Sequence, residues 1–311
     1  MTRVAIINPR SGGGRTRSRI GEIAARLNAA LGETDLLMTD APLAAERLTR
    51  EALKRGATHI IAVGGDGTIS ECVNGFFENG RAVSPAASFS PLMSGTGGDF
   101  KRTFGLDDDL EKTIARIATA KSRPIDVAHV TLMSKDGKTI NRHFINIGSF
   151  GLSGQVVQAV NRARLSKLFG GRFAYLYNSL VATLRYRNKR VRLKIDASFD
   201  GELDVSTIAI CNGRFFGGGM MVAPDADPAD GAFDIIVLAG GAKRDVLREL
   251  GTIYTGEHVK NPRVKVMRGQ RVIAAPLGGN DGPVLIELDG EQPGTLPATF
   301  TIMPGAIQLR V

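Results

Sequence analysis

Residues 62–75 read AVGGDGTISECVNG and place one carboxylate, Asp66, among glycines between an apolar strand and a helix. Glycines after a strand let the backbone approach a ligand, and the N-terminus of the following helix favours phosphate. The stretch is not a Walker A loop, because it lacks the terminal Gly-Lys-Ser/Thr. It is not a dinucleotide-binding GxGxxG motif either, because Ser70 stands in place of the last glycine. An acid beside phosphates needs a divalent cation between them, or a hydroxyl group or proton to accept. The alternative is a turn in which Asp66 caps the helix.

Two further glycine loops follow strand-like segments. Residues 8–15 read NPRSGGGR and carry Arg10 and Arg15, and residues 94–104 read SGTGGDFKRTF and carry Asp99. Loops at the ends of successive parallel strands line one edge of a sheet, which is where open α/β folds bind their ligands. The three loops together therefore predict one anion-binding site.

The pattern of apolar residues changes along the chain. The first part alternates strands and helices, which is typical of an α/β layer, whereas Asp-Gly turns at 136–137 and 200–201 predict antiparallel hairpins in a β-rich second part that begins near Asp126. The expected strands are Arg3–Ile7, Asp35–Met38 and His59–Val63, and the expected helices are Thr16–Leu31, Leu43–Arg55, Gly171–Arg187 and Lys243–Tyr254.

Composition limits the class of protein. The chain has 311 residues, 43% of them hydrophobic and 23% charged, which is ordinary for globular domains. Cys72 and Cys211 have no metal-ligand spacing, and the sequence shows neither a signal peptide nor an apolar run of about 20 residues. We expect a cytoplasmic protein.

The net charge of +9 is unevenly distributed. Residues 137–195 contain twelve Lys or Arg and no acidic residue, and apolar side chains are interspersed among them. Such a segment suits an anionic membrane surface, although a solvated helix face remains the alternative. No nucleic-acid-binding motif accompanies the charge, so we expect no nucleic-acid partner.

Taken together, the motifs resemble the diacylglycerol kinase catalytic family of lipid kinases, which includes sphingosine kinases and is a structural relative of the NAD kinases. The resemblance rests on NPRSGGGR, VGGDGTISECVNG, GTGGDFKRTFG, IDVAHV (125–130), FGGGMMVAPDADPADGAFDIIVL (216–238) and LDGE (288–291). It implies an α/β plus β fold. Residues 1–125, completed by about 295–311, would form an α/β nucleotide-binding domain like those of NAD kinases and phosphofructokinase, and residues 126–294 a β-sandwich-like domain for the lipid substrate.

The resemblance also implies roles for residues at matching positions. The nucleotide phosphates and Mg²⁺ would be held by Asn8, Thr39, Gly65, Asp66, Gly67, Thr68 and Thr96. Glu291 would be the general base, with Asp66 as the alternative, and Asp99 and Asp126 would support the site. Lys167 and Arg172 would face phosphate or membrane. Asp230, with main-chain oxygens of Asp227 and Ala232, would hold a structural Mg²⁺ unless it lies in an ordinary surface turn.

The expected function is that of a peripheral kinase at the inner face of the membrane, which uses ATP and Mg²⁺ to phosphorylate a lipid hydroxyl, first of all that of diacylglycerol. Two alternatives remain, a kinase of a soluble acceptor related to NAD kinase and an inactive nucleotide- or lipid-binding homologue. Gly98 replaces the usual Asn of the family and keeps the second open, while Gln155 replaces an acid that some members direct at the lipid head group. Whether the chain forms a homodimer is also left open.

Overall fold

The computed structural model describes residues 2–93, 98–107, 109–162, 186–239, 251–278 and 282–311. The chain divides into two compact units, one formed by residues 1–127 and 304–311 and the other by residues 128–303. It passes from the first unit to the second within strand β7 (Arg123–Ser134) and returns within strand β18 (Glu291–Leu309).

A parallel sheet forms the centre of the first unit, with the strand order β2-β1-β3-β6-β18. Every residue of β3 is buried, as expected for a parallel strand that is covered on both faces. The end of β18 completes the sheet, because Gln308 and Leu309 pair with Ser88 and Phe89 of β6. The other strands of this sheet are β1 (Arg3–Ile7), β2 (Thr34–Met38), β3 (His59–Gly64) and β6 (Ser88–Met93).

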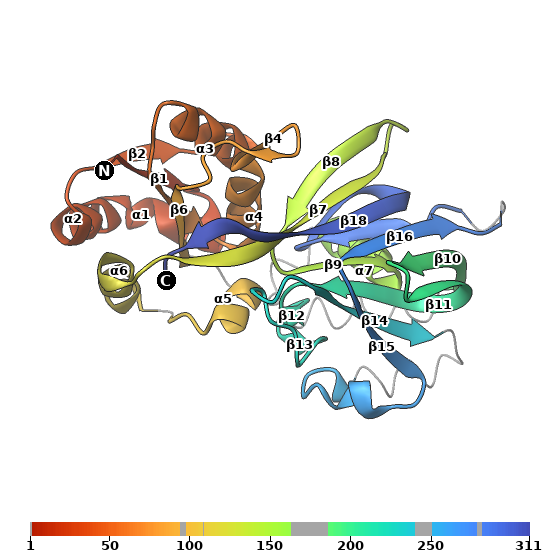
Figure 1. The fold of residues 1–311 in the computed structure, drawn as a ribbon. Coiled ribbons are helices and arrows are strands. Elements are labelled where there is room, and N and C mark those ends of the chain that lie inside the picture. Colours follow the sequence, from red (N-terminus) through yellow and green to blue (C-terminus); the bar gives the residue numbers. More distant parts are fainter. Residues whose placement is uncertain (1, 94–97, 108, 163–185, 240–250, 279–281) are drawn as a thin grey trace. The chain divides into compact units, whose positions relative to one another are not determined.

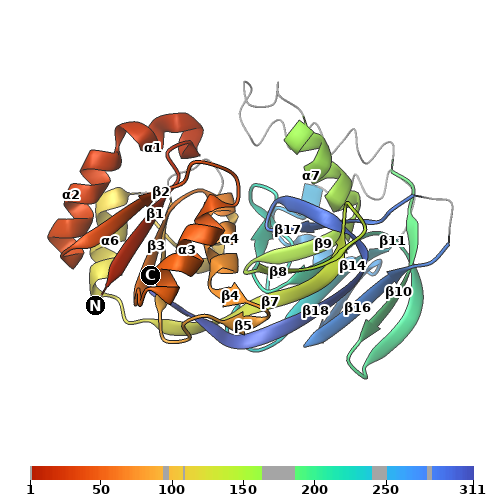
Figure 2. The same cartoon turned by 90° about the horizontal axis from the view of Figure 1, so that it is seen from above.

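Helices cover both faces of this sheet (Figure 2). Helices α2 (Ile20–Leu31) and α6 (Leu110–Thr119) pack apolar side chains against β1 and β3 on one face, and α3 (Ala44–Lys54) and α4 (Asp66–Gly75) lie on the other. The helix expected from Thr16 is interrupted at Arg19, which separates the short α1 (Arg15–Ser18) from α2. The remaining elements are η1 (Ser11–Gly14), α5 (Asp99–Phe104), β4 (Phe77–Glu78) and β5 (Arg81–Ala82).

The second unit is mainly antiparallel (Figure 1). Its longest run of paired strands has the order β15-β14-β11-β10-β16-β18, while β17 pairs with β9 and β18, and β7 pairs with β8. The bounds are β8 (Thr139–Phe144), β9 (Ile147–Gly151), α7 (Leu152–Arg162), β10 (Lys189–Ile195), β11 (Phe199–Cys211), β12 (Phe215–Phe216), β13 (Met220–Met221), β14 (Phe233–Ala239), η3 (Glu257–Lys260), β15 (Val264–Gly269), β16 (Arg271–Pro276) and β17 (Leu285–Leu288).

Strand β11 connects the parts of this second unit. Its first half pairs with β10 and its second half with β9, and the register of its pairing with β14 shifts between Val205 and Thr207. An irregularity of this kind lets one strand change partners and turn around a core. That core contains Phe144, Phe233 and Phe300, and the ring centroids of Phe144 and Phe300 are 6.3 Å apart.

Two expected turns have different outcomes. The Asp136-Gly137 turn is confirmed, since β7 and β8 pair up to Met133 and Thr139 on either side of it. The turn expected at 200–201 is wrong, because both residues lie inside β11 and the chain reverses at residues 196–198 instead. Asp196 adopts the left-handed conformation (φ 45°), and its carboxylate accepts the Gln270 and Arg271 N–H groups, each at 2.8 Å. The helices expected over 171–187 and 243–254 fall largely outside the described residues.

Candidate functional site

Residues expected to bind nucleotide gather at the carboxyl edge of the first unit's sheet. Since β1, β2 and β3 run parallel, Asn8, Thr39 and Asp66 leave neighbouring strands at the same edge. The Asn8 N–H donates to the carbonyl oxygen of Val63 (2.9 Å), and the Thr39 N–H donates to that of Ile7 (2.9 Å). Both loops are therefore anchored to the strand beside them.

Asp66 joins two of the glycine loops. It is the first residue of α4, whose N-cap is Gly65, and its Oδ2 accepts the Gly98 N–H at 2.8 Å. The carboxylate thus bridges to the loop after β6 and does not cap its own helix. Its Oδ1 is shielded from solvent, and no group in the described part of the chain donates a hydrogen bond to it. A carboxylate fixed through one oxygen, with the other left over, suits a cation or a donor hydroxyl.

Close packing at Gly64 sets the position of Thr68. A Cβ atom at Gly64 would lie 2.3 Å from Thr68 Oγ1 and 2.5 Å from Thr68 Cβ. Without that atom, the first turn of α4 closes onto β3, and Asn8 Nδ2 donates to Thr68 Oγ1 at 3.1 Å. Gly64 is a site residue that our sequence analysis did not identify, since spacing alone cannot distinguish it from Gly65. Gly67 is exposed.

The loop after β1 takes its shape from left-handed glycines. Gly12, Gly13 and Gly14 have φ values of 61°, 70° and 91°, a region that other residues rarely adopt. Arg15 Nε donates to the Gly12 carbonyl oxygen at 2.9 Å, so this arginine closes the loop. The loop is consequently held by its own residues.

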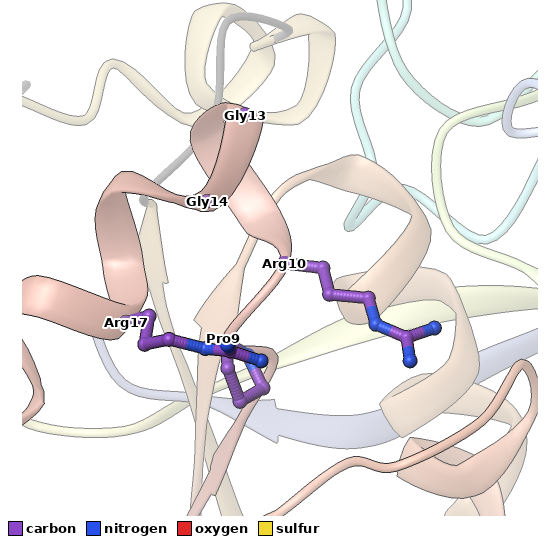
Figure 3. A pocket seen from close by; sticks show the side chains of 5 residues that line it. All are labelled: Pro9, Arg10, Gly13, Gly14 and Arg17. Atoms are coloured by element: carbon purple, nitrogen blue, oxygen red, sulfur yellow. The ribbon is translucent and has the colours of Figure 1, made fainter.

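A hollow of about 400 Å³ lies beside this loop and is lined by Pro9, Arg10, Gly13, Gly14 and Arg17. Figure 3 shows the Arg17 side chain beside Pro9, whereas the Arg10 side chain extends away from Gly13 and Gly14. Two guanidinium groups beside open backbone make a binding place for an anion. Arg10 and Arg15 were expected from the sequence, whereas Arg17 was not, because it follows the glycine loop inside the short helix α1.

The third glycine loop is described only in part. Thr96 lies outside the described residues, whereas Gly98 has φ 133° and ψ 29° and donates the hydrogen bond to Asp66. Asp99 begins α5, with its Oδ1 3.3 Å from Arg102 Nη1. Because few residues other than glycine adopt the backbone angles at position 98, Gly98 is compatible with this arrangement where the family's usual Asn would be strained.

Two other acids of the first unit accept hydrogen bonds from backbone N–H groups. Glu71, on α4, accepts the N–H groups of Leu43 (3.1 Å) and Ala45 (3.0 Å) at the start of α3, which follows the loop of Thr39. Sequence reasoning overlooked this role. Asp126 is buried, and its Oδ1 accepts the Gly305 N–H at 2.8 Å where β18 bends. The support for the site that we expected from Asp126 stays a prediction.

In the second unit, Glu291 stands at the tip of the hairpin formed by β17 and β18. Asp289 (φ 45°) and Gly290 (φ 89°) form its turn, and Leu288 pairs with Glu291. Glu291 is exposed, as a proton acceptor for an incoming hydroxyl group must be. Its role as general base stays a prediction.

Two acids, one before this turn and one within it, anchor it through hydrogen bonds. Glu287 is buried, and its carboxylate accepts the Ser149 hydroxyl at 2.5 Å and the Gly290 N–H at 2.6 Å. Asp289 accepts the N–H groups of residues 145, 146 and 147 at 2.9–3.1 Å. The sequence analysis missed both residues, although the alternation Glu-Leu-Asp-Gly-Glu would have placed Glu287 and Asp289 around the turn.

The surroundings of Asp230 do not fit the structural Mg²⁺ that the resemblance implied. Asp230 Oδ1 accepts the Ala232 N–H at 3.1 Å, and its Oδ2 is hydrogen-bonded to the Arg268 guanidinium. The carbonyl oxygen of Asp227 accepts the Asp230 N–H at 3.4 Å. Both carboxylate oxygens are therefore engaged, and the positive charge of Arg268 opposes a second cation.

Part of the basic segment, residues 137–195, is paired with acids. Arg190 lies 2.9 Å from Glu202, and Arg192 lies 3.0 Å from Asp200 across the β10–β11 pair. Lys189 is buried, whereas Arg187 is exposed. Lys167 and Arg172 lie outside the described residues. A sequence segment without acids is thus partly neutralised by the next strand.

The described residues include neither a membrane-spanning helix nor a cluster of metal ligands. Of the helices described there, none has both the length and the apolar character needed to span a membrane. The described side chains include no group of three or more His, Cys, Asp or Glu arranged to hold a metal. Mg²⁺ often takes one or two carboxylates and completes its shell with water and substrate phosphates, so Asp66 fits Mg²⁺ that arrives with a nucleotide.

Family models match both parts of the chain. The model of the diacylglycerol kinase catalytic domain matches residues 2–130, and that of the YegS C-terminal NAD kinase beta sandwich-like domain matches residues 146–311. The β-sandwich-like second part expected from the sequence is confirmed by this match.

Curated relatives are similar over nearly the full length. A diacylglycerol kinase of Staphylococcus haemolyticus is 31% identical over 304 residues, which cover 95% of this chain and 83% of the relative. One from Bacillus subtilis is 28% identical over 303 residues, which cover 96% and 93%.

Solved structures agree on the fold. The structure of a diacylglycerol kinase from Bacillus anthracis has a TM-score of 0.70 at 18% identity and covers 99% of this chain and 96% of that one. Yeast NADH kinase in complex with NADH has a TM-score of 0.53 at 13% identity and covers 99% and 82%. The α/β plus β class, with its likeness to NAD kinases, is confirmed.

Proposed function

The chain belongs to the diacylglycerol kinase family, whose members are phosphotransferases with an alcohol acceptor, and from this we propose its reaction. It transfers the γ-phosphoryl group of ATP to a hydroxyl group of a membrane lipid, first of all that of diacylglycerol. One observation carries most weight. Asp66 is fixed through Oδ2 by Gly98, and its Oδ1 has no partner among the described residues, at the edge where three glycine loops meet. A nucleotide-bound cation suits such an oxygen.

The phosphates would be held by the loops of the first unit. Asn8 and Thr68 are linked by a hydrogen bond, and the arginines of the hollow beside Gly13 supply positive charge. Thr39, Gly65, Gly67 and Thr96 would add contacts. Since phosphoryl transfer demands positioning and neutralisation of charge with little covalent chemistry by the protein, polar groups of this kind suffice for the donor.

Mg²⁺ would be held through Asp66, where it would neutralise charge on the phosphates. Asp99 and Asp126 would support the site, and neither needs to contact the metal. No role is proposed for a structural Mg²⁺ at Asp230.

The acceptor hydroxyl would lose its proton to Glu291. The hairpin that carries Glu291 is fixed by Glu287 and Asp289, which suits a base that must keep one orientation. General bases contribute about 10²–10⁴-fold to rate. Asp66 is the alternative base if Glu291 acts on the metal instead.

Attachment to the membrane would be peripheral and electrostatic. Lys167, Arg172 and the exposed Arg187 belong to the basic segment and would face phosphate or anionic lipid. We place the enzyme in the cytoplasm at the inner face of the membrane.

The test is a transfer assay. Purified protein is incubated with ATP labelled at the γ-phosphate, Mg²⁺, and vesicles with or without diacylglycerol, and labelled lipid is separated by chromatography. We expect labelled phosphatidic acid from vesicles that contain diacylglycerol. If ATP binds but no lipid is labelled, even with a total lipid extract, the proposal is wrong.

Two variants with matched controls identify the residues. Glu291→Gln is expected to lower kcat by about 10²–10⁴-fold with little change in ATP binding, and Asp66→Asn to lower both Mg²⁺-dependent ATP binding and kcat. Glu33→Gln and Asp35→Asn, at the opposite end of β2, make the same chemical changes and should leave activity intact. Full lipid phosphorylation by Glu291→Gln would transfer the role of base to another residue.

A further inference from the structure

Residues 225–234, here called the acidic loop, contain Asp225, Asp227, Asp230 and Asp234 and lead into β14. Oxygen-rich loops of this kind suit a divalent cation. In this chain, however, β14 pairs with β15 so that Asp234 stands directly opposite Arg268. The strand register therefore delivers a guanidinium group to the acids.

Arg268 contacts two of the four acids. Its Nη2 is hydrogen-bonded to Asp230 Oδ2, and its Nε lies 3.8 Å from Asp234 Oδ1. The Asp234 side chain is only 8% exposed. Burial raises the pKa of Asp234, Arg268 lowers it, and Asp230 and Asp225 raise it again. One guanidinium group thus acts on two carboxylates, those of Asp230 and Asp234.

Protein donors also occupy several of the oxygen atoms around the acids. The carbonyl oxygen of Gly231 accepts Gln270 Nε2 at 3.1 Å, and that of Ala226 accepts Arg214 Nε at 2.9 Å. Asp227 Oδ1 accepts the Ala229 N–H at 3.1 Å. A divalent cation would have to displace several of these hydrogen bonds, and Mg²⁺ demands a nearly octahedral set of oxygens.

We propose that the Arg268 guanidinium supplies the positive charge that holds the acidic loop, so that this part of the chain folds without a bound divalent cation. Arginine suits the position because its planar group bonds carboxylates in fixed directions and keeps its charge. The proposal is independent of the transfer reaction.

The first test uses the unmodified full-length chain without nucleotide. Its Tm is measured in EDTA and in 5 mM MgCl₂, with ionic strength equalised by KCl. We expect the same Tm in both solutions and no Mn²⁺ bound through Asp230 when binding is followed by electron paramagnetic resonance. A lower Tm in EDTA, or a bound Mn²⁺ that is lost in Asp230→Asn, overturns the proposal, and neither result depends on whether an Arg268 variant folds.

The second test is a double-mutant cycle. In EDTA, Arg268→Gln and Asp230→Asn should each lower the Tm by about 2–4 °C, as expected for a loss near 1 kcal/mol in a unit of this size. The double variant should be no less stable than Arg268→Gln alone, because Asp230→Asn then removes no further contact of Arg268. Arg271→Gln, an exposed arginine on β16, is the control and should leave the Tm unchanged. Additive losses, or an unaltered Tm in Arg268→Gln, contradict the proposal.

Discussion

At the scale of single residues, the two oxygens of Asp66 explain why an acid stands among glycines. One oxygen fixes the carboxylate to Gly98, while the other lacks a partner among the described residues. Each neighbouring glycine has a different reason to be there, since Gly64 makes room for Thr68 and Gly98 adopts backbone angles that other residues avoid. These separate constraints lead to separate tests.

Gly64→Ala should disturb the nucleotide site without abolishing the fold. The added Cβ would lie 2.3–2.5 Å from Thr68 Oγ1 and Cβ, so the first turn of α4 must move away from β3 and break the bond from Asn8 to Thr68. Overpacking of this kind costs about 1–3 kcal/mol. We expect KM for ATP to rise by about tenfold, the equivalent of about 1.4 kcal/mol. Gly21→Ala, which adds a Cβ where no atom lies within 4 Å, is the control in steady-state kinetics.

His59 should contribute to acid destabilisation. Its ring is fully buried, with Nε2 2.9 Å from Ser90 Oγ, and burial, followed by Arg310 and Arg3, lowers the pKa of His59 from 6.5 to about 4. Between these values the unfolded chain binds a proton that the folded chain refuses, so stability falls as pH decreases from 6.5 towards 4. The loss is on the order of 3 kcal/mol.

Denaturant titrations from about pH 4 to about pH 8 measure this effect. His59→Gln should show a shallower decrease in unfolding free energy towards acid pH than the unmodified chain, while the slopes above pH 7 should agree. His129 and His258, whose pKa values are also lowered by burial, provide the slope that remains. Equal slopes for variant and parent below pH 6.5 would contradict this assignment to His59.

At the scale of elements, the hairpin of β17 and β18 is held in place by hydrogen bonds within its own unit. Glu287 ties the turn to Ser149 on β9, and Asp289 ties it to the segment that leads into β9. These contacts involve none of the nucleotide loops of the first unit. Catalysis and nucleotide binding should therefore respond separately to changes in the hairpin.

Ser149→Ala tests this separation. Removing the hydroxyl leaves the buried Glu287 with one donor fewer, at a cost of about 1–3 kcal/mol, and loosens the turn before Glu291. We expect kcat to fall severalfold while KM for ATP changes less than about twofold, because the lost contact positions the base and not the nucleotide. Ser198→Ala, in the exposed turn between β10 and β11, is the matched control. A parallel rise in KM for ATP would show that the hairpin also governs nucleotide binding.

Local patterns predicted many elements and missed their partners. The strands of the first unit and the turn at 136–137 follow from short apolar runs and an Asp-Gly pair, which act locally. The reversal at residues 196–198 did not follow, because Asp196 is fixed by N–H groups of residues 270 and 271, far away in the sequence. The roles of Glu71 and Glu287 were hidden for the same reason.

At the scale of the whole molecule, the order of the motifs predicted the α/β plus β fold and the family. The positions of the glycine loops also predicted that Asn8 and Asp66 share one sheet edge, because parallel strands place their carboxyl ends together, whereas Thr39 was expected only from the family resemblance. The exposure of the basic residues in 137–195 could not be predicted from the sequence. The acids that pair with Arg190 and Arg192 belong to the following strand, so an acid-free stretch of sequence is not an unpaired surface.

Membrane binding should therefore depend on basic residues of the segment other than Arg190 and Arg192. Replacing Lys167, Arg172 and Arg187 by Gln should weaken binding to vesicles of anionic lipid, with about 1 kcal/mol lost for each charge and about a hundredfold in total. The effect should shrink as salt rises, because screening weakens exposed charges. Replacing Arg47, Arg55 and Arg81 by Gln changes the net charge equally within the first unit and is the control in vesicle sedimentation. If both triple variants bind like the unmodified chain, the basic segment does not attach the enzyme to membranes, and the lipid must be reached through apolar contacts.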